Sequence, residues 1–179
     1  MVRVEKAMMT GINCGSGQRP FTSTPEVRWI NIDSQEKWNP EIVCDALTIP
    51  LPDESADYFV LHHVLEHFGC DGGDGIIKEA HRLLKPGGSL LVSVPDIRAL
   101  AQKYVLGDID EFIFKVNLYG AYMGDEADRH KWGYTFDSLH MTMMNAAPWY
   151  TVKRFDNRYI PGMSFAADWW ILAQEGVKK

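Results

Sequence analysis

Apolar runs and stretches of helical periodicity alternate along this chain. Short apolar runs of strand length occur at the approach to Asn13, at 29–33, at 43–47, at 58–61 and at 89–94. Between the last two, apolar residues recur at helical spacing over 76–84, after a loop rich in glycine at 69–75. This alternation predicts an α/β fold with a mainly parallel sheet, whose ligand lies beyond the carboxyl ends of the strands.

The second half of the chain predicts more helix. Amphipathic helices are expected at 97–105, 112–119 and 135–146, the last capped by Thr135 or Asp137, and closing strands at 151–155 and 167–173. The stretch 108–132 is longer than a connection between two elements needs. We therefore expect a single domain over residues 1–179, with 108–132 as a cap over the site.

The first fifty residues carry the residue types of a nucleoside site. The run N-C-G-S-G at 13–17 supplies a glycine turn, and Asp33 and Asp45 end the next two apolar segments. Glycine lets the backbone turn tightly and touch a ligand, and a carboxylate about twenty residues later suits ribose hydroxyls. A dinucleotide site would need a third glycine and a long helix, whereas Pro20 and Pro25 interrupt this segment. The pattern therefore favours S-adenosylmethionine over NAD, because S-adenosylmethionine has no phosphate to bind.

Four segments, in this order, resemble those of one family. They are I-N-C-G-S-G-Q-R-P at 12–20, R-W-I-N-I-D at 28–33, I-V-C-D-A-L-T-I-P-L-P-D-E-S-A-D-Y-F-V-L-H-H-V-L-E-H at 42–67 and H-R-L-L-K-P-G-G-S-L-L-V-S-V-P-D at 81–96. The set is similar to small class I S-adenosylmethionine-dependent methyltransferases, and more narrowly to their compact methyltransferase type 11 branch. The resemblance covers residues 8–96 and indicates the cofactor rather than the substrate.

This resemblance implies a Rossmann-like sheet, mostly parallel, with an antiparallel last strand for which W-W-I-L at 169–172 is the candidate, and with helices on both faces. It also implies that the glycine turn, the two carboxylates and the backbone after the fourth strand hold S-adenosylmethionine. The expected cofactor-binding residues are Asn13, Cys14, Gly15, Ser16, Gly17, Asp33, Asp45, Ala46, Leu47, His62 and His63. The chain departs from the family pattern twice: Asn13 stands where an acidic residue is common, and the helix after the glycine turn must be short or lost.

Length, charge and cysteine count narrow the class of protein. The 179 residues carry a formal net charge of -6, which argues against nucleic acid as a partner because its binders present a basic face. The sequence also lacks the Asn/Asp-Pro-Pro-aromatic and Pro-Cys motifs of DNA methylation. No apolar run approaches the length of a membrane span, so we expect a soluble, cytoplasmic protein. The three cysteines lack C-x-x-C spacing and predict neither a disulfide framework nor a zinc knuckle.

The run from His63 to His67 spells H-x-x-E-H, the signature of inverted zinc peptidases. In such enzymes the two histidines bind zinc and the glutamate acts as the base. Here the motif follows directly on a buried strand, and the sequence offers no obvious third ligand. We therefore expect no metal at His63 and His67, and a zinc metallopeptidase is a remote alternative.

Methyl transfer needs few catalytic side chains, because the sulfonium is already a good leaving group and much of the acceleration comes from alignment. If the acceptor is a hydroxyl, a histidine with a pKa near neutrality suits the role of base. His63, His67 and His130 are the candidate catalytic residues, and each is equally compatible with a structural role.

The acceptor is expected beneath the segment 108–132, whose residues combine apolar faces with polar tips. They are Tyr119, Tyr122, Arg129, His130 and Trp132, with His130 the first candidate for the base. We expect a small-molecule or glycan-like acceptor, and the oligomeric state stays open. The alternative function is a non-catalytic protein that binds S-adenosylmethionine.

Overall fold

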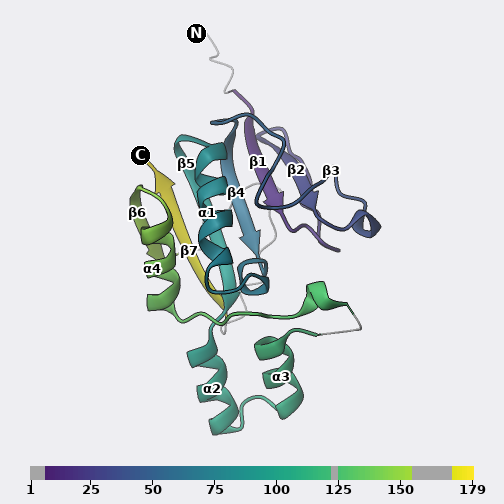
Figure 1. The fold of residues 1–179 in the computed structure, drawn as a ribbon, viewed down its shortest axis with the longest axis vertical. Helices are drawn as coiled ribbons and strands as arrows, with labels where there is room; N and C mark the ends of the chain where they lie inside the picture. Colours follow the sequence, from purple (N-terminus) through teal and green to yellow (C-terminus); the bar gives the residue numbers. More distant parts are fainter. Residues whose placement is uncertain (1–6, 122–124, 155–170) are drawn as a thin grey trace.

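The computed structural model describes residues 7–121, 125–154 and 171–179, with only the backbone for 171–173. Its strands are β1 Met9–Cys14, β2 Val27–Asp33, β3 Ile42–Val43, β4 Ala56–His62, β5 Leu84–Pro95, β6 Trp149–Arg154 and β7 Ile171–Lys178. They form one sheet in the order β3-β2-β1-β4-β5-β7-β6 (Figure 1). Strand β7 pairs antiparallel with both β5 and β6, and the other pairs are parallel. The predicted α/β sheet with an antiparallel last strand is confirmed.

Two long helices cover one face of this sheet. The helices are α1 Gly72–Leu83, α2 Ile97–Leu106, α3 Glu111–Tyr119 and α4 Phe136–Ala146, and the short 3-10 turns are η1 Glu36–Trp38, η2 Leu65–His67 and η3 Glu126–Asp128. Helices α1 and α4 lie side by side in front of the sheet (Figure 1), and their buried Ile76 and Leu139 share one core with Ile12, Phe59 and Val92 of the strands. The helices expected at 97–105, 112–119 and 135–146 are present. Thr135, one of the two predicted caps, closes a capping box with Ser138.

The opposite face has a separate apolar cluster. It contains Val27, Trp29, Val60 and Leu91 from the strands and Phe21 from the loop after β1, whose ring meets Trp29 edge to face at 4.9 Å between centroids. Over the described residues this cluster includes no helical side chain, and β1 and β2 are joined by loop alone. The prediction that the helix after the glycine turn is short or lost is therefore confirmed.

The glycine-rich stretch before α1 is partly helical, so the prediction of a loop over 69–75 is wrong from Gly72 onward. A Cβ at Gly73 would lie 2.8 Å from the Tyr134 hydroxyl, and one at Gly75 would lie 3.0 Å from Leu47. Tertiary packing accounts for the difference. The first turn of α1 lies too close to its neighbours for larger side chains to fit. The stability gained from this close packing outweighs the low helix propensity of glycine.

The closing strands are shifted relative to the prediction. Strand β6 begins at Trp149, whose buried indole Nε1–H donates to the Met143 carbonyl at 2.8 Å. Strand β7 runs on to Lys178, beyond the predicted 167–173, and residues 167–170 of that prediction lie outside the described residues. The extension was missed because it buries polar side chains, among them Glu175, which accepts a hydrogen bond from Ser89 Oγ at 2.9 Å.

Helices α2 and α3 and the turn η3 lie beyond the carboxyl ends of the strands (Figure 1). Asp96, directly after β5, starts α2 by accepting the backbone N–H groups of Arg98 and Ala99. The chain returns to the sheet at Tyr134, which forms a β-bridge with Asp96. That 108–132 acts as a cap stays a prediction. Among the helices of the described ranges, none is long and apolar enough to cross a membrane.

Candidate functional site

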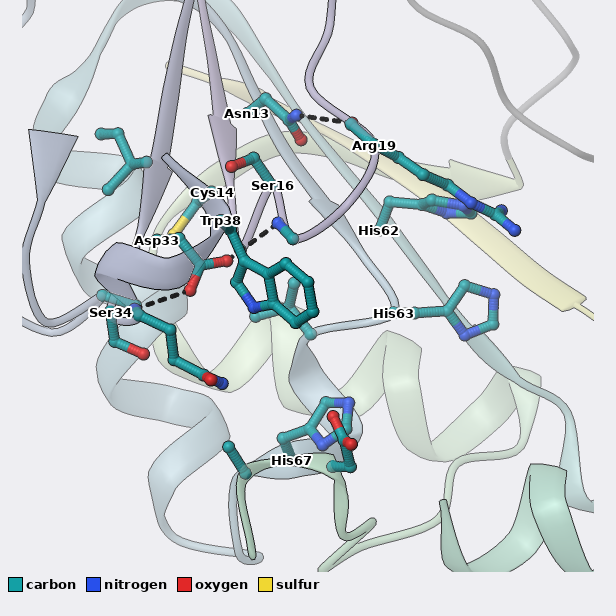
Figure 2. Close-up of a pocket in the computed structure, with 18 of the residues that line it drawn as sticks. Asn13, Cys14, Ser16, Arg19, Asp33, Ser34, Trp38, His62, His63 and His67 are labelled. Carbon is teal, nitrogen blue, oxygen red and sulfur yellow. Dashed lines mark hydrogen bonds between the residues drawn. The ribbon is translucent and has the colours of Figure 1, made fainter. Parts of the chain in front are cut away.

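A cavity of about 900 Å³ opens at the carboxyl ends of β1, β2 and β4. Strand β1 lies between β2 and β4, so the order of the sheet reverses here, and such a switch point is where open α/β sheets bind ligands. Of the residues predicted to bind the cofactor, all except Leu47 line the cavity: Asn13, Cys14, Gly15, Ser16, Gly17, Asp33, Asp45, Ala46, His62 and His63. Figure 2 shows this wall around Asp33 and the histidines.

The glycine turn is held against the end of β2. The backbone N–H groups of Gly15 and Ser16 both donate to the Ile32 carbonyl, at 2.8 and 3.0 Å. Gly15 has a φ of +71°, and a Cβ there would come within 2.4 Å of a Val64 methyl group. Only glycine fits this position, because both the left-handed backbone and the contact with Val64 exclude a side chain.

Asp33 is buried, and its carboxylate connects the glycine turn after β1 with the segment that follows β2. One carboxylate oxygen accepts the Gly17 N–H and the other accepts the Gln35 N–H, each at 2.9 Å (Figure 2). An ionised carboxylate accepts about four hydrogen bonds, so two remain for a ligand. Asp33 therefore shapes the glycine turn as well as offering acceptors to the cavity.

Asn13 also supports the loop that follows the turn. Its amide Nδ2 donates to Asn31 Oδ1 at 2.9 Å and to the Arg19 carbonyl at 3.4 Å. Asn31 in turn accepts the Phe21 N–H and donates to the Phe21 carbonyl. A carboxylate at position 13 could not donate, so this network accounts for an amide where an acidic residue is common in the family.

Trp38 is a cavity residue that the sequence analysis missed. It ends η1, five residues after Asp33, and its indole lies beside the Asp33 carboxylate (Figure 2). The preceding Lys37 lies over the indole at 4.7 Å and forms an ion pair with Asp125 at 2.6 Å. The only available signal was an aromatic residue just after the acidic strand end.

His62 ends β4 and His63 follows it, on the other side of the cavity (Figure 2). His62 Nδ1 shares a hydrogen bond with Ser93 Oγ at 2.6 Å, and burial, with the adjacent His63, lowers the pKa of His62 to about 4. His63 has a φ of +55°, and its Nδ1 lies 3.0 Å from Oε1 of the buried Glu66. A carboxylate in this position orients an imidazole.

His67 lines the cavity, whereas His130 stands behind it and is not part of the wall. The two rings meet edge to face at 4.9 Å between centroids. Burial lowers the pKa of His130, although the nearby Glu66 opposes this effect. Glu66, His67 and His130 each bring one potential metal-ligand atom within 4.8 Å of the other two. The H-x-x-E-H motif itself runs from the end of β4 into η2 instead of lying within one helix.

The segment 108–132 contributes other residues than those predicted for the acceptor. Asn117, Ala127, Asp128 and Lys131 line the cavity. Tyr119, Arg129 and Trp132 are exposed and outside the cavity wall, and Tyr122 lies outside the described residues.

Cys14 lines the cavity at the end of β1. Burial raises the pKa of the Cys14 thiol well above its ordinary value, with Cys44 and Asp33 adding to the effect. The thiol is therefore protonated at neutral pH, which excludes Cys14 as a thiolate nucleophile.

Comparisons with known proteins agree with this geometry. A family model described as a methyltransferase domain matches residues 22–92. The chain is 36% identical over 69 residues to the tetracenomycin polyketide synthesis 8-O-methyl transferase TcmO of Streptomyces glaucescens, covering 37% of this chain and 20% of that protein. It is 33% identical over 112 residues to the ubiquinone/menaquinone biosynthesis C-methyltransferase UbiE of Caulobacter sp. (strain K31), covering 60% and 37%. The chain thus spans well under half the length of these curated relatives.

Among solved structures, the fold is similar to the Burkholderia thailandensis 1,6-didemethyltoxoflavin-N1-methyltransferase with bound 1,6-didemethyltoxoflavin and S-adenosylhomocysteine. The TM-score is 0.57 at 15% identity, over 96% of this chain and 71% of that one. At this identity the likeness shows the fold alone. Residues 22–92 thus match a methyltransferase domain, and the strand order and the cavity at the switch point agree with the expected resemblance of this chain to class I S-adenosylmethionine-dependent methyltransferases of the methyltransferase type 11 branch.

Proposed function

We propose that this chain transfers a methyl group from S-adenosylmethionine to a small-molecule acceptor. The observation that carries the proposal is the buried Asp33 carboxylate, which bonds the glycine turn and keeps acceptor capacity at the switch point of the sheet. S-adenosylmethionine, when bound, supplies an activated methyl group on a sulfonium.

The residues of the β1 and β2 ends fit a nucleoside. Asp33 offers acceptors for ribose hydroxyls, and the Trp38 ring offers an apolar surface for a base. The open space around Gly17, where an added Cβ would meet nothing within 4 Å, lets a ligand approach the backbone. Asp45 offers a further acceptor for an exocyclic amine, and its carboxylate also accepts the Leu47 N–H at 2.9 Å.

The residues on the opposite wall suit a polar acceptor. His63 is the candidate base, because its Nδ1 is held by Glu66 and its side chain is about one-third exposed. Asn117 and the cationic Lys131 come from the segment 108–132 and suit a hydroxylated or anionic molecule. TcmO and the toxoflavin methyltransferase are named for small-molecule methylation, which supports an acceptor of this size.

Two measurements test the proposal. Calorimetry should show that S-adenosylhomocysteine binds with one site per chain, and that Asp33→Ala weakens it. S-adenosylmethionine labelled in its methyl group, incubated with the protein and a cell extract, should then label the small-molecule fraction, and the Asp33→Ala variant should not.

Each part of the proposal can fail by itself. Lack of S-adenosylhomocysteine binding would overturn the cofactor assignment. Label confined to protein or nucleic acid would overturn the small-molecule acceptor. Tight binding with no labelled product from extract would favour the non-catalytic alternative.

A further inference from the structure

We propose that Glu66, His67 and His130 form a binding site for a divalent transition-metal ion, with zinc the ion that suits them best. One ligand atom from each residue lies within 4.8 Å of the other two. Two imidazoles and a carboxylate are a ligand set of catalytic zinc sites, which keep a fourth position open. The two imidazoles disfavour magnesium, which prefers oxygen ligands.

The hydrogen bonds of both histidines leave one ring nitrogen, Nε2, available. His67 Nδ1 lies 3.0 Å from the Arg129 carbonyl oxygen, and His130 Nδ1 lies 2.9 Å from that of Asn117. A carbonyl only accepts, so each Nδ1 carries a proton and donates it. The lone pair of each ring is therefore at Nε2. Imidazoles that bind metals are usually held in this way, by a hydrogen bond from the other nitrogen to a carbonyl or carboxylate.

The carboxylate of Glu66 supplies the second, independent observation. The side chain is buried, with 1% of the residue exposed, and Oε1 lies 3.0 Å from His63 Nδ1. Its other oxygen, Oε2, is also buried and has no hydrogen-bond partner among the residues that the structure describes. A buried carboxylate oxygen without a partner is costly, and a cation bound there would remove that cost.

Backbone hydrogen bonds join the two segments that carry the ligands. The Glu66 carbonyl accepts the N–H groups of Lys131 and Trp132, at 2.8 and 3.1 Å, and the His130 N–H donates to the Tyr119 carbonyl at 3.1 Å. The residue that follows His130 is thus bonded directly to η2. Ligand atoms around tetrahedral zinc are about 3.4 Å apart, so binding requires only a small contraction of this cluster.

The site borders the acceptor end of the cavity. His67 belongs to both the cluster and the cavity wall, which also includes His63 and Lys131. An ion here would hold an oxygen of the acceptor at its open position and lower the pKa of that hydroxyl. This role rests on the proposed function, whereas metal binding itself does not. His63 is not a ligand in this site, which distinguishes it from the peptidase arrangement.

Zinc binding by the full chain tests the proposal. Protein purified without an affinity tag, and stripped with a chelator, should bind one Zn²⁺ per chain in calorimetry, with a rise in the unfolding temperature. His67→Gln, His130→Gln and Glu66→Gln should each weaken zinc more than about a hundredfold, since even an outer-shell partner contributes 10- to 100-fold. His140→Gln, a half-buried histidine of α4, is the matched control and should bind zinc like the unaltered protein.

Cobalt gives a readout on the unaltered protein that does not depend on the folding of any variant. Co²⁺ should produce the visible bands of a tetrahedral nitrogen and oxygen site, without thiolate charge transfer. A thiolate band, less than one zinc per chain, or zinc affinity unchanged in both histidine variants would overturn the site. Calorimetry with S-adenosylhomocysteine separates the two proposals. If S-adenosylhomocysteine binds and zinc does not, only the metal site is overturned. If zinc binds and S-adenosylhomocysteine does not, only the cofactor assignment is overturned.

Discussion

Asp33 and Gly17, which both line the cavity, are joined by a hydrogen bond: the buried carboxylate accepts the Gly17 backbone N–H at 2.9 Å. The residue predicted to bind the ribose therefore also holds the glycine turn that lines the cavity. A variant at Asp33 should affect the ligand and the turn together, and the two effects need separate measurements.

We expect Asp33→Ala to weaken S-adenosylhomocysteine at least about tenfold, because hydrogen bonds to a charged acceptor contribute about 1.5 to 3 kcal/mol each. Calorimetry measures the affinity, and denaturant unfolding measures the cost to the turn. Asp45→Ala is the matched control: this carboxylate lines the same cavity but is exposed, so its loss should have a smaller effect. Equal affinities for the Asp33 variant and the unaltered protein would contradict the ribose assignment.

His63→Asn should lower kcat about a hundredfold or more while leaving S-adenosylhomocysteine affinity nearly unchanged. Asparagine is chosen because it tolerates the positive φ of +55° at this position, so the change removes the imidazole without straining the backbone. Steady-state kinetics on the identified acceptor measures kcat. Full activity would show that His63 is structural. A parallel loss of cofactor affinity and stability would do the same.

Asn13→Asp should destabilise the fold by about 1 to 3 kcal/mol. The new carboxylate would face Asn31 Oδ1, and Asn31 cannot turn its amide without losing both of its hydrogen bonds to the Phe21 backbone. Denaturant unfolding measures the loss, and Asn145→Asp on the exposed side of α4 makes the same chemical change as a control. The expectation fails if both variants are equally stable.

Gly15→Ala should cost at least about 2 kcal/mol of unfolding free energy, from the left-handed backbone and from the 2.4 Å approach of the new Cβ to Val64. Gly87→Ala separates the two causes, because Gly87 has a φ of +80° but nothing within 4 Å of its added Cβ. It should lose only the backbone part, about 1 kcal/mol. Similar losses at both positions would mean that the contact with Val64 relaxes freely.

The half-buried His62 should make the protein less stable in weak acid. Its folded pKa of about 4 lies below the ordinary 6.5, so the unfolded chain binds the proton more readily than the folded one. The contribution of neutral His62 is fully present above pH 6.5 and is lost as the pH falls toward 4, by at most about 3 kcal/mol. Unfolding measured at several pH values should show that the free energy of unfolding falls less steeply for His62→Gln than for the unaltered protein over that window. An unchanged slope would show that other groups cause it.

The sequence by itself determined the local parts of this protein. The alternation of apolar runs and helical repeats established the α/β sheet, and the glycine turn with Asp33 located the cavity wall, because strand ends bring residues to one edge of a sheet through topology alone. Thr135 was recognisable as a cap because capping depends on residues within one turn.

Other features were decided by tertiary structure. Glycines at the start of α1 are helical because this turn packs closely against Tyr134 and Leu47. The extension of β7 beyond residue 173, which includes Gln174 and Glu175, is a strand because β5 and β6 pair with it. His130 meets His67 and Glu66 only because the chain returns from α3 and donates two backbone N–H groups to the Glu66 carbonyl. The third ligand of the proposed metal site, His130, therefore comes from a distant segment, and no spacing within H-x-x-E-H encodes such a contact.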